Sequence, residues 1–457
     1  MNQPSPESSP SIPPRPRVAL VVGKDPLKWN RGGAVNYARS HALAAQRAGY
    51  EVHLFCLAVQ DEEIRTEFGL LHRVRGPRQA PDGATAANSH RPADALLQWA
   101  RTLGYREVGA HLYASALTAA VVQFVVSQGT DCVLHGFSTW GGIVLEARSQ
   151  LSRLGLHVPV VNSLYTSLRH EQEGKQRGLR TVRSWLPHFQ LWIERWWVGV
   201  PAARLEQRVV KESPVLIVNY AAVRDLLELE YGPLPQLSIM PYCEAGGFSE
   251  LKSAPHESEI QITNGIPHLV TLSRHDPRKG LDIFIRALAV LHERGVEFRA
   301  TLGSSGDLLT YHQNLTRSLG LQAQVSFSGW LDDPAPLLDS GDIFVLPSLE
   351  EGSGSIALLE AMRYGLAVVV SDVDGIPEVI TGDVEGLLVP PGDSAALAAA
   401  LTRLIHDRPL RERLARAASA RHALRADPAR FTAALGGLYD RLRAGTRLPE
   451  EMRVRGR

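Results

Sequence analysis

The sequence predicts an α/β protein in which two Rossmann-like, doubly wound domains face each other across a cleft. Short apolar runs of strand length alternate with helical segments through most of the 457 residues, and this alternation is typical of parallel sheets covered by helices. The pattern occurs twice, on either side of a polar, glycine-rich stretch over 241–265. Each half is long enough to bury its own core, and ligands of such sheets bind beyond the carboxyl ends of the strands.

The first half opens with a parallel-sheet unit. An apolar run over 17–22 is followed by a helical segment and then by a second apolar run over 51–57. A strand, a helix and a strand in this order form a βαβ unit. The segment 61–106 shows no clear periodicity. Further strands are predicted over 131–137, 158–164 and 214–219.

The second half repeats the pattern more clearly. Its strongest helix is predicted over 280–295, where leucine, isoleucine and phenylalanine form one apolar stripe at helical spacing. Helical segments separate its apolar runs, as in the first half. Strands are predicted over 268–274, 297–303, 324–329, 342–348 and 367–372.

These patterns divide the chain into four parts. Residues 1–16 are rich in proline and serine and lack the apolar region of a signal peptide, so we expect a disordered lead. The two domains are expected over 17–244 and 245–425. The last part, 426–457, is expected to form a helix that returns toward the N-terminal domain, followed by a basic tail.

Composition argues against several classes of function. The net charge of +1 creates no field that would attract nucleic acid. Cys56, Cys132 and Cys243 lie far apart in the sequence, which excludes a disulfide framework and a sequence-local zinc site and fits a reducing cytosol. No apolar run approaches the roughly 18 residues of a membrane-spanning helix. We therefore expect a cytoplasmic protein.

A glycine pair precedes the first predicted helix. Gly32 and Gly33 would let backbone N–H groups approach a ligand closely, and a helix N-terminus favours an anion. The same pair also fits an ordinary turn. Its spacing differs from GxGxxG, which argues against a dinucleotide cofactor.

Two cations stand directly before the strongest helix. Arg278 and Lys279 oppose the helix dipole there, at a cost of about 0.3–1 kcal/mol, so an anionic group is expected nearby. Asp282 could supply it. We favour the alternative, a bound phosphate that Arg274 also contacts.

The segment PSLEEGSGSIALLEAM over 347–362 combines acids with small residues. Gly-Ser-Gly-Ser at a helix start is typical of an anion cradle, and a carboxylate in the same cleft can accept hydrogen bonds from sugar or ribose hydroxyls. Glu350 and Glu351 also fit the description of solvated loop acids. Glu360 does not, because its neighbours in the sequence are apolar.

Several motifs in a fixed order resemble the nucleotide-sugar half of retaining family 4 glycosyltransferases (glycosyl transferases group 1) of the GT-B fold. The resemblance is dense over 270–401 and specific as a set. It extends loosely to the glycine pair near the N-terminus. Its elements are SR…KG (273–280), Gly303, FSGW (327–330), PSLEEGSG…LLEAM (347–362), SDVDGIPEVI (371–380) and EGLLVPPGD (385–393).

The resemblance implies transfer of a glycosyl group from a nucleotide-sugar donor, the co-substrate, with retention of configuration and no metal or other cofactor. The N-terminal domain would lie on the acceptor side, and the C-terminal domain would bind the donor. Arg274 and Lys279 would hold the diphosphate, and Glu351 would contact the sugar. Further donor contacts would come from Gly32, Gly33, Ser328, Gly329 and Trp330 near the base, Gly354 and Ser355 through N–H groups, and Glu360 at the ribose.

The sequence departs from the family pattern between the two glutamates. The family places seven residues there, whereas eight separate Glu351 from Glu360. Glu350 is therefore the alternative sugar contact. Asp372 and Asp374 form a DxD pattern known from metal-binding glycosyltransferases, but they fall in the SDxGGxPE loop of this family, so we expect no metal.

The family often carries a histidine in its N-terminal domain. His135 and His170 are the candidates, with His135 included in the predicted catalytic set and a structural role open for both. Four tryptophans among arginines, at 185, 192, 196 and 197, predict either ordinary packing of a helical insert or a peripheral contact with the inner face of the membrane.

Two other functions fit the same fold. One is another GT-B activity, a sugar-nucleotide epimerase or a phosphorylase, against which the motif order argues. The other is a sugar-nucleotide-binding partner without catalysis, which only the longer spacing before Glu360 favours.

Overall fold

The computed structural model describes most of both predicted domains. The described residues are 15–23, 25–27, 33–75, 109–180, 182, 187–189, 191, 192, 195, 202–240, 242–245 and 265–446.

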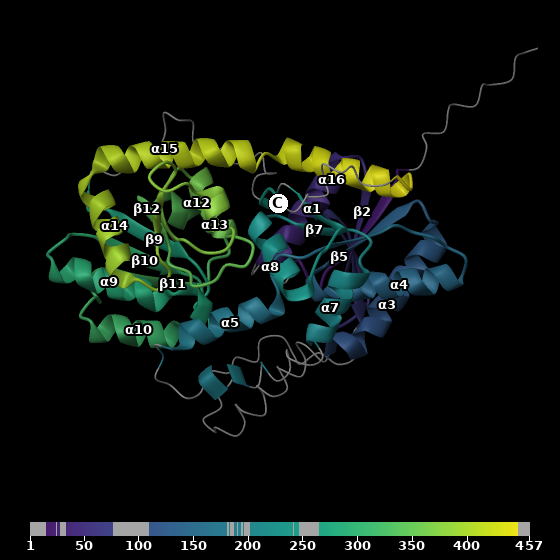
Figure 1. Ribbon diagram of the computed structural model, residues 1–457, viewed down its shortest axis with the longest axis horizontal. Coiled ribbons are helices and arrows are strands. Elements are labelled where there is room, and N and C mark those ends of the chain that lie inside the picture. Colours follow the sequence, from purple (N-terminus) through teal and green to yellow (C-terminus); the bar gives the residue numbers. More distant parts are fainter. Residues whose placement is uncertain are drawn as a thin grey trace, which may run out of the picture.

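An eight-stranded sheet forms the N-terminal domain (Figure 1). Its pairings are parallel except between β3 and β4, which pair in antiparallel register. All six residues of β5 are buried, as expected for a central strand covered on both faces. In sheet order the strands are β3 (Glu62–Thr66), β4 (Gly69–Arg75), β2 (Glu51–Ala58), β1 (Arg17–Val21), β5 (Cys132–Phe137), β6 (Val160–Ser163), β7 (Leu216–Val218) and β8 (Leu237–Ile239).

Helices cover both faces of this sheet. Alternate residues of β1 point to opposite faces, so that Leu20 packs in one core with α1 while Val21 packs in another with α3 and α4. The helical elements are α1 (Gly33–Arg47), α3 (Gly109–Gln128), η3 (Ser138–Trp140), α4 (Gly141–Arg153), α5 (Leu168–Leu179), α7 (Ala203–Glu212) and α8 (Ala221–Tyr231).

The C-terminal domain contains a six-stranded parallel sheet. Every residue of β12 and β13 is buried. The strands, in sheet order, are β11 (Val325–Gly329), β10 (Arg299–Gly303), β9 (His268–Leu272), β12 (Ile343–Leu346), β13 (Ala367–Ser371) and β14 (Leu387–Val389). The helical elements are η7 (Pro277–Lys279), α9 (Leu281–Glu293), α10 (Leu309–Ser318), α11 (Ala335–Asp339), α12 (Ile356–Arg363), α13 (Ile376–Val379), α14 (Ser394–His406), α15 (Arg408–Arg425) and α16 (Pro428–Arg443).

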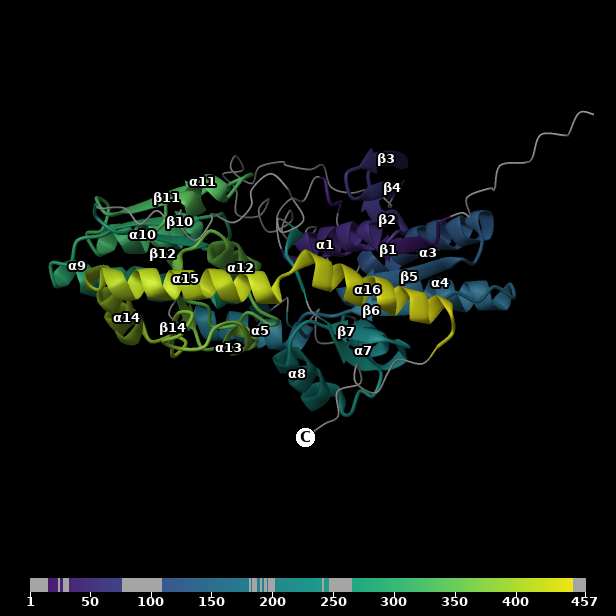
Figure 2. The same ribbon diagram turned by 90° about the horizontal axis from the view of Figure 1, so that it is seen from above.

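The last two helices connect the domains. α15 packs on α12 and β13, whereas α16 packs on α1, so the chain returns to the N-terminal domain (Figure 2). Asp427 lies between the two helices and accepts a hydrogen bond from the backbone of Ala429 at the start of α16. Gly436 allows the close contact with α1's end, because a Cβ there would lie 2.7 Å from the Cβ of Ala48.

The predicted fold class is confirmed, with four additional strands. β3 and β4 lie in the segment without clear periodicity, and none of the residues of the edge strand β3 is buried. β8 and β14 are three residues each, too short for a periodic pattern. Within the described ranges, none of the helices has the length and apolar character needed to cross a membrane.

Candidate functional site

Three loops meet at the carboxyl edge of the C-terminal sheet, following β9, β12 and β13. The backbone N–H of Leu349 donates to the carbonyl of Arg278 at 2.8 Å, which joins the first two loops. Asp374 joins the second and third, because its Oδ2 accepts from the N–H groups of Glu351 (2.7 Å) and Gly352 (2.9 Å). This edge is where ligands of parallel α/β sheets bind.

Lys279 and Glu351, predicted to hold the diphosphate and the sugar, are direct neighbours. The Lys279 Nζ lies 2.8 Å from Glu351 Oε1, and the two side chains are 13% and 4% exposed. The Ser348 hydroxyl donates to the same carboxylate oxygen. The ion pair holds a cation and an acid at the sheet edge before any ligand binds.

Arg278 is buried among three carboxylates. Its guanidinium lies 2.7 Å from Glu350, 3.3 Å from Asp276 and 3.4 Å from Glu171. Burial alone would lower its pKa, but these acids raise the pKa above its usual value. The anionic partners of the cations before α9 are thus these acids and Glu351. Arg274 is exposed beside them, and its charge helps to lower the pKa values of Glu171 and Asp276 against the effect of burial.

α5 lies against these loops although it follows β6 of the other sheet (Figure 1). His170 Nε2 lies 2.9 Å from Asp374 Oδ1. Burial opposes charge on this ring, but Asp374 and Glu350 raise the pKa of His170 above its usual value.

Two glycines give α5 its close approach. A Cβ at Gly178 would lie 1.8 Å from the carbonyl oxygen of Pro277, and one at Gly174 would lie 2.6 Å from the Cβ of Glu350. Sequence reasoning singled out Arg278 and, on α5, His170, but it did not predict that α5 packs against these loops. The signal that was available is the spacing of the two glycines, four residues apart on one helix face.

His170, Glu350 and Asp374 could together hold a metal ion, since one ligand atom from each lies within 4.8 Å of the others. Their existing contacts favour a different explanation. Asp374 accepts from two N–H groups and His170, and Glu350 pairs with Arg278. A divalent cation would have to compete with the guanidinium for Glu350.

Glu360 lies in α12 beside a second carboxylate. Burial is the main reason that its pKa rises to about 8, and the nearby Glu244 adds to the rise while Arg363 opposes it. Glu244 is fully buried and lies 3.1 Å from His422 Nε2 of α15.

The small-residue loop before α12 contacts the N-terminal domain. The Tyr37 hydroxyl of α1 lies 3.1 Å from Ser353 Oγ, and a Cβ at Gly354 would lie 2.8 Å from the Tyr220 ring. Ser355 caps α12 by accepting from Leu358 N–H. α1, the helix predicted to face the donor phosphates, therefore meets this loop directly.

The remaining residues predicted to contact the donor lie at the start of α1 and at or just after the end of β11. Gly33 is the first residue of α1, whereas Gly32 lies outside the described residues. Ser328 and Gly329 end β11, and Gly329 accepts from Ser304 N–H at 2.7 Å. The Trp330 indole donates to Asp332 at 2.9 Å.

His135 lies in the core rather than with the loops. Nδ1 lies 2.7 Å from the Tyr439 hydroxyl and Nε2 lies 2.7 Å from Ser163 Oγ. Burial lowers its pKa well below the usual value. With both ring nitrogens engaged and the side chain fully buried, the placement favours a structural role over the predicted catalytic one.

Of the four tryptophans, the structure describes Trp192 alone. Its side chain is 65% exposed and its ring stacks on that of Phe189 at 6.1 Å. The other three lie outside the described residues, and membrane contact stays a prediction.

Residues 266–407 match the family of glycosyl transferases group 1. The chain is 34% identical over 371 residues to a putative colanic acid biosynthesis glycosyltransferase, WcaL, of Escherichia coli, covering 77% of this chain and 82% of that protein. Matches to the first three curated relatives span 35%, 64% and 38% of their lengths.

Solved structures share the fold. A sucrose-phosphate synthase from Thermosynechococcus elongatus superposes with a TM-score of 0.68 at 18% identity, covering 94% of this chain and 100% of that one. HepE from Anabaena, solved in complex with UDP-glucose, superposes with a TM-score of 0.60 at 16% identity, covering 93% and 99%.

Proposed function

Because this chain belongs to the glycosyl transferases group 1 family, we propose that it transfers a sugar from a nucleotide-sugar donor to an acceptor hydroxyl with retention of configuration. The observation that carries the proposal is the Lys279–Glu351 pair, 2.8 Å apart at the carboxyl edge of the donor-side sheet. In the donor, the sugar is bonded directly to the diphosphate. An acid for the sugar and a cation for the diphosphate must therefore lie side by side, as Glu351 and Lys279 do.

The reaction breaks the bond between the anomeric carbon and the phosphate oxygen and forms a bond from that carbon to the acceptor oxygen. Negative charge grows on the leaving diphosphate. Lys279 and Arg274 stabilise this charge, and removing one donor to a growing negative charge typically costs about 2.7–4 kcal/mol. The acceptor's proton passes to a phosphate oxygen of the leaving group on the same face of the sugar, which accounts for retention.

Glu351 positions the sugar by accepting hydrogen bonds from its hydroxyls. Binding must first loosen the Lys279 pair, since the same oxygen accepts from Ser348 and Lys279. Glu360 accepts from the ribose, and the base lies against 328–330. We propose a uridine nucleotide as the first donor to test, because the similar HepE was solved with UDP-glucose.

No metal is needed in this mechanism. Arg274 and Lys279 supply the positive charge that a cation gives to the diphosphate in other enzymes. A chelator should therefore leave transfer unchanged. Loss of activity with EDTA and recovery with magnesium or manganese would instead assign Asp374, with His170 and Glu350, to a metal.

The test is a screen of nucleotide sugars for thermal stabilisation in the presence of EDTA, since a ligand that binds the folded state raises the melting temperature by mass action. Lys279→Ala should lose the stabilisation. Arg403→Ala, which removes an exposed cation of α14 that pairs with Asp383, should keep it. Donor turnover without a new glycoside would support an epimerase instead, and binding without any turnover would support a non-catalytic partner.

A further inference from the structure

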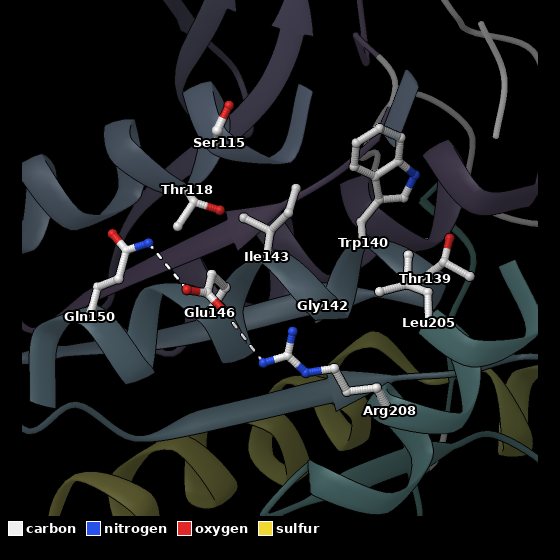
Figure 3. A pocket seen from close by; sticks show the side chains of 10 residues that line it. All are labelled: Ser115, Thr118, Thr139, Trp140, Gly142, Ile143, Glu146, Gln150, Leu205 and Arg208. Carbon is white, nitrogen blue, oxygen red and sulfur yellow. Dashed lines mark hydrogen bonds and ion pairs between the residues drawn. The ribbon is translucent and has the colours of Figure 1, made fainter. Parts of the chain in front are cut away.

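A pocket of about 290 Å³ lies on the N-terminal domain, between α3, α4 and α7 (Figure 3). The helices around the pocket share a core with Ala19 and Val21 of β1. These side chains point away from α1, so the pocket lies on the face of the sheet opposite α1. Its size is at the lower end for small-molecule sites. None of the residues predicted to bind the donor lines it.

One wall of the pocket is a row of three planar polar side chains. Gln150 Nε2 donates to Glu146 Oε1 at 3.2 Å, and Arg208 Nη2 donates to Glu146 Oε2 at 3.4 Å (Figure 3). The side chains of Glu146 and Arg208 are both partly exposed. The hydrogen bonds hold the row in place, and a ligand can still contact it. Planar groups in fixed positions suit bidentate hydrogen bonds to neighbouring hydroxyls.

The lining of the pocket includes a polar atom that has no partner among the described residues. Thr118 of α3 is 1% exposed, and its hydroxyl makes no hydrogen bond to any described residue. Buried hydroxyl groups are normally hydrogen-bonded. A ligand hydroxyl in the pocket would supply the missing bond.

The other wall is aromatic and aliphatic. Trp140 closes one end of the pocket in Figure 3, with Ile143 beside it. The indole is held against the end of β1, where a Cβ on Gly23 would lie 1.8 Å from its Nε1. A fixed aromatic face opposite polar side chains matches the two faces of a sugar ring, one of C–H groups and one edged with hydroxyls.

We propose that this pocket binds a neutral sugar residue of the acceptor. The proposal rests on the proposed function, which requires an acceptor. Glu146 and Arg208 balance each other in charge, so the wall does not select an anion. Trp140 belongs to η3, directly after β5, and this places the pocket's aromatic end at the carboxyl edge of the N-terminal sheet.

The experiment is saturation-transfer NMR of the full chain with methyl glycosides of glucose, galactose and mannose as probes. At least one glycoside should receive saturation from the wild type. Thr118→Val, which keeps the shape and removes the hydroxyl, and Arg208→Met should weaken that binding by roughly tenfold or more, the effect of one or two lost hydrogen bonds. Arg408→Met is the matched control, because Arg408 pairs with Glu412 at i,i+4 as Arg208 pairs with Glu212, and it should bind as the wild type does.

Binding of a nucleoside diphosphate, measured on the same samples by calorimetry, separates this proposal from the proposed function. Pocket variants that lose the glycoside but keep the nucleotide support the pocket. The proposal is overturned if no glycoside binds the wild type, or if Thr118→Val and Arg208→Met bind it normally. A wild type that binds glycosides but no nucleotide would contradict the proposed function; the pocket would then be a sugar site without an acceptor role.

Discussion

The two domains each bury a polar cluster near the ends of their central strands, but the clusters are of opposite kinds. In the C-terminal domain, the charged cluster consists of Arg278, Lys279, Glu350, Glu351 and Asp374 with His170 from α5. In the N-terminal domain, the neutral cluster consists of His41, His135, Ser163 and Tyr439.

The pKa shifts separate the two clusters. Burial lowers the pKa of His41 to about 4 and that of His135 well below its usual value, so both rings are uncharged. In the charged cluster burial acts in the same sense on His170 and Arg278, yet neighbouring carboxylates reverse it. Buried side chains keep their charge in a folded protein only where they are paired. The ion pairs of the charged cluster offer partners that a bound anion could exchange, whereas the hydrogen bonds of His135 in the neutral cluster hold the core together.

The largest expected effect is on catalysis in the charged cluster. Lys279→Ala should lower turnover by 10²-fold or more, on the order of 2.7–4 kcal/mol, the usual loss when a donor to a growing negative charge is removed. Initial rates with the nucleotide-sugar donor measure this, with Arg403→Ala as the control. A near-normal rate, or a variant that simply unfolds, would contradict the assignment of Lys279 to the phosphate.

Substitutions at Glu351 and Glu360 should affect different steps, sugar transfer in the first case and nucleotide binding in the second. Losing a hydrogen bond to a charged group costs about 1.5–3 kcal/mol, so Glu351→Gln should slow transfer. It should not weaken the affinity for nucleoside diphosphate, because it also removes the ion pair that engages Lys279. Glu360→Ala should weaken that affinity. Calorimetry and rates on both variants make the comparison. If Glu351→Gln transfers sugar normally, the longer spacing has displaced this acid, and Glu350→Gln becomes the variant to test.

In the neutral cluster, substitution should affect stability rather than rate. His135→Asn cannot reach both Ser163 and Tyr439, and a buried group left without its partner costs about 1–3 kcal/mol. Denaturant unfolding measures the loss, and the rate per folded molecule should not change. A rate lower by 10²-fold in the folded variant would show that His135 takes part in proton transfer.

The smallest effect is a dependence on pH. The pKa of His170 is raised in the folded protein, so its pair with Asp374 stabilises fully below the unfolded pKa of about 6.5, and this contribution is lost as the pH rises through the folded pKa. The melting temperatures of wild type and His170→Asn should therefore differ most at acidic pH and converge at alkaline pH. A difference that is constant across this range would mean that His170 contributes through packing alone.

The sequence predicted the fold well because several strands inside the two sheets, such as β1, β12 and β13, are apolar runs. The strands it missed are either three residues long or, as in β3 and β4, polar enough at the sheet edge to hide their periodicity.

In the site, the family resemblance predicted donor contacts for Lys279 and Glu351, and the structure shows that the two side chains form a pair. Their roles toward a donor stay predictions. The contact of His170 with Asp374 joins residues 204 positions apart, which no periodicity reveals. The placement of His135 could not be predicted either. Its hydrogen-bond partners in the core, Ser163 and Tyr439, are also distant in the sequence.

The central claim is that Arg274 and Lys279 bind the donor diphosphate without a metal, and calorimetric titration of UDP in EDTA tests it most directly. The account predicts that UDP binds the wild type, and that Arg274→Ala combined with Lys279→Ala abolishes binding while Arg403→Ala leaves it intact. The account is contradicted if the double variant binds UDP as tightly as the wild type, or if the wild type binds it only after magnesium or manganese is restored.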